Sequence, residues 1–139
     1  MENLQLRKKI NNPEGNYPPL HHAIINLSLD LGRFAESPNK KYNKIIPEIT
    51  FWLFRMDTEV KLGVDCDKNY QQKLSHIKEC QDLLALISIG FEHIFRLRLI
   101  TEKSFNGLMN SLQDIRQQIE NWSNKTLNSI KLEGLSVNK

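Results

Sequence analysis

The chain has 139 residues, of which 40% are hydrophobic and 25% are charged, and its formal net charge is +3. These values are ordinary for one globular domain and exclude wholesale disorder. Charged side chains interrupt both apolar stretches, residues 45–64 and 83–100, which argues against a membrane span. Two cysteines are too few for a disulfide framework, and the first residues lack the apolar run of a signal peptide. We therefore expect a cytoplasmic protein with no membrane contact.

The first helix is predicted over about residues 20–36. Residues 1–19 are rich in asparagine, glycine and proline and predict a tail or a short N-terminal segment. From Leu20 to Phe34, apolar residues recur every three or four positions, which lines one face of a helix. Pro38 ends this helix, because a proline disfavours the helical conformation in the residue before it.

Two further helices are predicted over about residues 43–64 and 68–99. Proline is tolerated only in the first turn of a helix, so the second helix either starts near Ile46 or bends at Pro47. Asp67 is the predicted N-cap of the third helix, and Gly90 marks a weak point within it.

The fourth helix is predicted over about residues 102–124, with Thr101 as its N-cap. Its apolar positions are Phe105, Leu108, Leu112, Ile115, Ile119 and Trp122. Residues 127–139 read as a flexible C-terminal tail. Four amphipathic helices with short loops, and no strand pattern, predict one domain over residues 20–126. Its expected fold is an all-α, antiparallel up-down four-helix bundle.

The sequence offers no recognisable catalytic or metal-binding constellation. It contains neither Gly-x-Ser-x-Gly nor a glycine-rich phosphate loop, and the paired Glu-x-x-His motif of di-iron bundles is absent. His76 and Cys80 lie one helical turn apart, which is suitable zinc-ligand spacing, but a zinc site needs three or four ligands. We therefore expect no enzyme activity, no metal and no cofactor.

Basic residues suggest contact with phosphate groups instead. Lys40, Lys41 and Lys44 cluster at the first interhelical turn. Arg96 and Arg98 close the third helix, which we expect to lie at the end of the molecule where the first helix begins, so the two groups need not coincide. Arg55, Lys61 and Arg116 extend a basic strip or simply occupy solvated helix faces. The candidate nucleic-acid-binding residues are Lys40, Lys41, Lys44, Arg55, Arg96, Arg98 and Arg116.

A surplus of large apolar side chains in the second helix suggests an interface. Phe51, Trp52, Leu53 and Phe54 are consecutive, and consecutive positions sweep round the whole helix. A helix that is apolar on all sides has to be covered on more than one of them. We therefore assign Phe51, Trp52 and Phe54 to a homo-oligomer or partner interface.

The sequence resembles a known family of four-helix bundles. The run Leu99-Ile100-Thr101-Glu102-Lys103-Ser104-Phe105, with the apolar positions up to Trp122, is similar to the family's last helix. This family includes the accessory variability determinant of diversity-generating retroelements and the proteins encoded in ribosomal-RNA intervening sequences. The likeness covers about residues 20–125. It implies a basic homopentamer that binds a reverse transcriptase and its RNA or RNA/DNA hybrid, although this chain carries a weaker positive charge.

These observations together predict a non-enzymatic accessory protein that assembles through its second helix and binds nucleic acid through its basic residues. One alternative is a protein-interaction adaptor, of the kind found in phages or mobile elements, that makes no nucleic-acid contact. Another is a ligand-binding bundle with a metal at His76 and Cys80.

Overall fold

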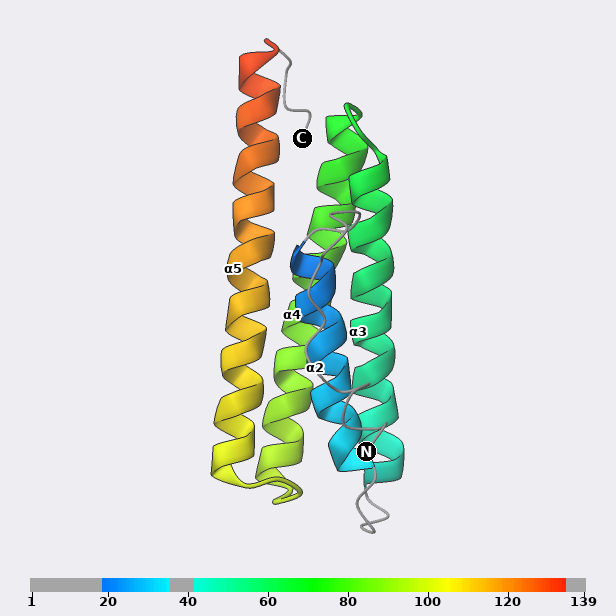
Figure 1. Ribbon diagram of the computed structural model, residues 1–139, viewed down its shortest axis with the longest axis vertical. Coiled ribbons are helices and arrows are strands. Elements are labelled where there is room, and N and C mark those ends of the chain that lie inside the picture. The colour runs from blue at the N-terminus through cyan, green and yellow to red at the C-terminus, as the bar shows by residue number, and fades with distance from the viewer. Residues whose placement is uncertain (1–18, 36–41, 135–139) are drawn as a thin grey trace.

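The computed structural model describes residues 19–35 and 42–134. Within these residues the chain is all-helical, with four helices and no strand, which confirms the predicted fold class at this level. The helices are α2 (Pro19–Ala35), α3 (Tyr42–Asp65), α4 (Tyr70–Arg96) and α5 (Glu102–Leu132). Figure 1 shows them side by side along the long axis of the molecule. Helix α3 packs between α2 and α4, and α5 packs between α4 and α2.

Helix α3 starts close to its predicted first residue, whereas helix α4 starts later than predicted. Helix α3 begins at Tyr42, so Pro47 stands inside it rather than in its first turn. Helix α4 begins at Tyr70, and its N-cap is Asn69, whose side-chain oxygen accepts a hydrogen bond from the Gln72 N–H. The prediction of Asp67 as the cap was wrong. Its φ of 51° is left-handed, whereas an N-cap normally has extended backbone.

The N-cap predicted for the last helix is confirmed, but the predicted end of that helix was wrong. The Thr101 hydroxyl accepts a hydrogen bond from the Ser104 N–H at 3.1 Å. Helix α5 continues to Leu132, so residues 127–132 are helical instead of belonging to the tail. Thr126 and Ile130 extend the buried face, and the Thr126 hydroxyl is satisfied by donating to the Trp122 carbonyl. A polar residue on the inner face therefore hid the continuation of the apolar pattern.

The core is mainly aliphatic, and all four helices contribute to it. Phe91 is its largest fully buried side chain. Gly90 lies next to Phe91 inside α4, where α4 closely approaches α3. A Cβ atom added at Gly90 would stand 2.9 Å from Ile49 Cγ1 and 3.2 Å from the Trp52 ring. The residue expected to be a weak point is thus a close-packing position between the two helices.

We predict opposite effects of alanine at two helical glycines. Alanine improves helix propensity by about 1 kcal/mol at either position. At Gly90 the new methyl overlaps Ile49, and overpacking costs about 1–3 kcal/mol, so we expect a net destabilisation of roughly 1 kcal/mol. Gly107 is exposed with nothing within 4 Å of such a methyl, so Gly107→Ala should stabilise. Urea unfolding of both variants tests this, and equal stabilisation would contradict the close contact.

Candidate nucleic-acid interface

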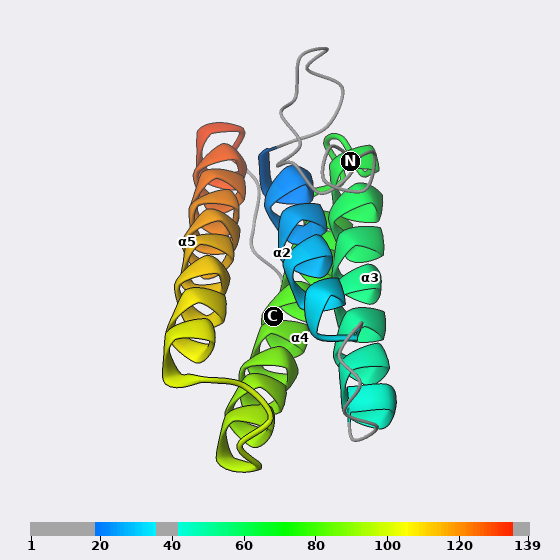
Figure 2. The ribbon, with the colours of Figure 1, turned by 60° about the horizontal axis from the view of Figure 1, so that its bottom comes forward.

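Five exposed lysine and arginine residues of the described chain lie at one end of the molecule, and one of them, Arg33 in the last turn of α2, lies 3.9 Å from Asp30. Lys44 is in the first turn of α3, Arg96 and Arg98 are at the end of α4, and Lys103 is in the first turn of α5. Figures 1 and 2 both show these three helix ends on the same side of the bundle. The expectation that Arg96 and Arg98 lie where the first helix begins was wrong, because α2 ends at this side. Lys40 and Lys41 are outside the described residues.

Arg98 is held in a backbone conformation that usually belongs to glycine. Its φ is 58°, in the left-handed region. The Arg98 N–H donates to the Phe95 carbonyl and the Leu99 N–H donates to the Ile94 carbonyl, both at 2.9 Å. These two bonds form a Schellman motif with Arg98 at the position where glycine is preferred. A side chain there costs about 1 kcal/mol or more, so the sequence keeps a charge at a position where glycine would fit better.

Apolar contacts fix the turn that carries Arg98. The Phe95 and Phe105 rings stack with centroids 4.4 Å apart, which joins the end of α4 to the start of α5. Leu99 and Ile100 are buried beside them, and Thr101 caps the next helix. The turn is therefore anchored on both sides, and it displays Arg98 on a defined surface.

The remaining candidate cations lie elsewhere. Arg55 is exposed on α3, while Arg116 lines a groove between α4 and α5 and donates to Gln113 Oε1 at 3.0 Å. Helices α3 and α5 are not packed side by side along their lengths, so the structure does not join Arg55 and Arg116 into one strip. Lys61 lies 3.8 Å from Asp57 within α3. Lys103, which the sequence interpretation omitted, belongs to the basic end because the α4–α5 turn places it beside Arg96 and Arg98.

The three aromatic residues assigned to an interface divide between surface and core. Phe51 is 56% exposed and Phe54 is 66% exposed. Trp52 is half-buried against the core, next to Gly90. Pro47, Thr58 and Leu62 are also exposed, and together with the two phenylalanines they recur every three or four residues along α3. This set, which we call the α3 outer stripe, lies opposite the face that carries Leu53 and the rest of the α3 core.

A buried polar contact between α2 and α3 was not predicted. Asp57 is only 7% exposed, and its Oδ1 lies 2.6 Å from His21 Nδ1. Both ring nitrogens of the adjacent His22 are buried without a hydrogen-bond partner among the described residues. The sequence pattern of α3 gave no signal for this contact, because Asp57 looks like an ordinary surface residue until α2 is placed beside it.

His76 and Cys80 have separate partners. His76 Nδ1 lies 3.1 Å from Glu59 Oε1, and the Cys80 thiol donates to the Met56 carbonyl at 3.7 Å. Burial raises the pKa of Cys80 to about 12, and the nearby carboxylates of Glu59, Glu79 and Asp57 add to the shift. The thiolate is the form that binds metals. Within residues 19–35 and 42–134, no group of three potential ligands is placed to hold a metal ion.

Comparison with protein families, curated proteins and solved structures finds no match for this chain. In the part of the chain that the structure describes, none of the helices has both the length and the apolar character needed to cross a membrane.

The two cysteines should react at very different rates. With a pKa near 12, Cys80 is a thiolate in only about one molecule in 10,000 at pH 8, and it is buried. Cys66 is only half-buried, in the turn that follows α3, and its Sγ donates to the Leu62 carbonyl. Ellman's reagent should therefore modify Cys66 quickly in the native protein and Cys80 only at the rate of unfolding. Cys66→Ser is the control, and rapid modification of that variant would contradict the buried position of Cys80.

Proposed function

We propose that the protein is a non-enzymatic accessory protein that self-associates and binds nucleic acid through its basic end. The bundle in this proposal is antiparallel and up-down, which is supported by the positions of the α3–α4 and α4–α5 connections at opposite ends of Figure 1. The partner is RNA or an RNA/DNA hybrid held by a reverse transcriptase, as the family resemblance implies. Phosphate contacts of this kind give affinity without sequence specificity and weaken as salt rises.

The observation that carries the proposal is Arg98. It keeps a cationic side chain in a left-handed position where glycine would be favoured, and it stands with Lys44, Arg96 and Lys103 at one end. Features that oppose stability are often retained at functional sites. Exposed Glu92 and Glu102 belong to the same region, so we expect modest affinity and strong salt dependence.

Arg98→Gly separates folding from binding. We expect the variant to be as stable as the parent or more stable by up to about 1 kcal/mol, since glycine adopts the left-handed conformation freely. It should nevertheless bind a short RNA/DNA hybrid more weakly, and the slope of log affinity against log salt should fall by about one. Fluorescence anisotropy across a salt series and urea unfolding measure the two effects.

Two matched controls come from the α3–α4 turn. Asp67→Gly replaces the other described non-glycine residue with positive φ, so it repeats the backbone change without removing a cation. Lys68→Gln removes one exposed positive charge at the opposite end of the bundle. Both should leave the salt slope unchanged. If Lys68→Gln lowers it as much as Arg98→Gly does, binding follows net charge and the assignment to this end is refuted.

Self-association is proposed to use the α3 outer stripe. Phe51 and Phe54 are mostly exposed, so replacing both with glutamine should leave the stability of the subunit nearly unchanged while reducing the mass of the assembly. Size exclusion with light scattering measures this mass. Leu132→Gln is the control, because Leu132 is an exposed apolar residue at the end of α5. A parent protein that is monomeric at every concentration would overturn this part of the proposal.

The protein-interaction adaptor is the second candidate function, and the same exposed stripe favours it. The two candidates differ in their prediction for the hybrid. An assembly that forms through Phe51 and Phe54 but ignores the hybrid even at low salt would support the adaptor and exclude the nucleic-acid role.

A further inference from the structure

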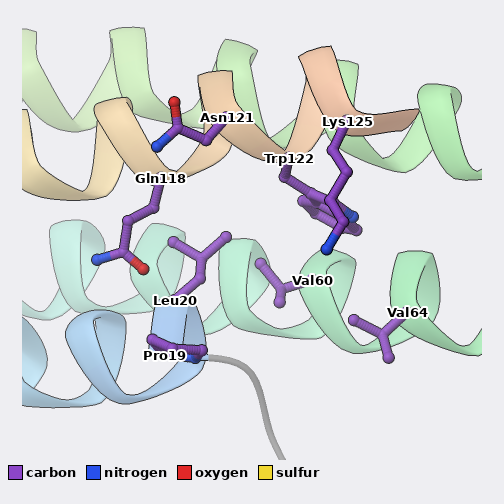
Figure 3. A pocket seen from close by; sticks show the side chains of 8 residues that line it. All are labelled: Pro19, Leu20, Val60, Val64, Gln118, Asn121, Trp122 and Lys125. Atoms are coloured by element: carbon purple, nitrogen blue, oxygen red, sulfur yellow. The ribbon is translucent and has the colours of Figure 1, made fainter. Parts of the chain in front are cut away.

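A cavity of about 310 Å³ opens where α2 begins, between α2, α3 and α5. Pro19 and Leu20 from α2 and Val60 and Val64 from α3 provide apolar walls, and Trp122 from α5 lies across from them, as Figure 3 shows. This volume is near the lower limit for small-molecule sites, which run from roughly 300 to 1,000 Å³ and are mostly apolar. The cavity is away from the end that carries Arg98.

The position of Trp122 depends on a glycine in α3. A Cβ atom added at Gly63 would stand 2.6 Å from Trp122 Cη2 and 2.9 Å from its Cζ2. The absence of a side chain at Gly63 therefore lets the indole lie directly against the α3 backbone. This contact positions the ring, which forms an aromatic wall of the cavity.

The polar groups of the cavity all come from α5 and favour a negative charge. Gln118 and Asn121 provide carboxamides, and Lys125 provides an ammonium group; none of the lining residues is acidic. Figure 3 shows the Lys125 side chain extending from α5 toward α3 beside Trp122. No carboxylate among the described residues lies within ion-pair distance of Lys125. An apolar body would fill the space between the walls while an anionic head meets the lysine.

We infer that this cavity binds a small amphiphilic anion, a carboxylate with an apolar body, whose head pairs with Lys125 and whose body lies between Trp122 and the two valines. This is a binding site separate from the proposed nucleic-acid interface. The amphiphile's shape matches the division of the lining into apolar walls and a cationic rim. Charge complementarity distinguishes it from a neutral or cationic compound of the same length.

Octanoate, 1-octanol and octylammonium, each below its aggregation concentration, test the inference on the full chain. The chain contains two tryptophans, so Trp52→Phe leaves Trp122 as the single fluorescent reporter. We expect octanoate to change Trp122 fluorescence saturably, 1-octanol to bind more weakly, and octylammonium to bind least. Methyl NMR signals of Val60 and Val64 should move along with the fluorescence change.

Three variants identify the parts of the site. Lys125→Met should weaken the binding of octanoate about two- to fivefold and leave the binding of 1-octanol unchanged, because an exposed ion pair contributes little more than this. Lys131→Met, which removes an exposed lysine farther along α5, should change neither. Val64→Phe fills the cavity from a partly exposed position and should weaken the binding of both octanoate and 1-octanol. Circular dichroism of each variant confirms that the fold is retained.

Several outcomes would overturn the inference. Octylammonium binding as tightly as octanoate, or octanoate binding that is unchanged in Lys125→Met, would remove the anion site. The absence of any saturable change with octanoate would remove the ligand site altogether. Nuclear Overhauser contacts between the valine methyl groups and protons of residues 1–18, together with no response to octanoate, would assign the cavity to the chain's own N-terminal residues.

Discussion

The arrangement of this bundle depends on the close approach of α3 to its surroundings at two buried glycines. Gly90 lets α4 approach Ile49 and Trp52, and Gly63 lets the Trp122 ring from α5 lie against α3. Both contacts are on the inner side of α3, and Phe51 and Phe54 stand exposed on its outer side. The exposed stripe and the cavity beside Trp122 are thus two consequences of one packing arrangement.

The sequence predicted what depends on periodicity and local chemistry. The apolar spacing of residues 20–34 and 105–122 was enough to place helices there, and Thr101 was recognisable as a cap. The predictions were wrong where a contact between helices or within a helix determines whether a polar residue is buried. Thr126 interrupted the apolar pattern, yet it is buried because its hydroxyl is satisfied within the helix. Asp57 looked like a surface residue, and only the position of α2 reveals its contact with His21. A contact between distant segments leaves no periodic signal in either of them.

The candidate basic site was predictable in its residue types but not in its grouping. Lys44, Arg96 and Arg98 were all identified, but their common location depends on which helix ends meet, and Lys103 joined them only through the α4–α5 turn. Nothing in the sequence indicates that Arg98 has positive φ, because arginine rarely occupies that region. The conformation follows from the burial of Leu99 on one side and the helix end on the other.

Under the proposed function, self-association and nucleic-acid binding support each other. One subunit offers Lys44, Arg96, Arg98 and Lys103 at its basic end, with Arg33 beside Asp30, and the exposed Glu92 and Glu102 offset part of this charge. That is too little charge for tight binding in physiological salt. Assembly through the α3 outer stripe would place several such ends in one particle, and linked weak contacts raise the affinity far above that of a single contact. Because the stripe runs along α3 while the cations lie at its starting end, covering the stripe need not cover the basic end. A bundle with modest net charge can therefore act on a phosphate backbone as an oligomer even where its monomer binds weakly.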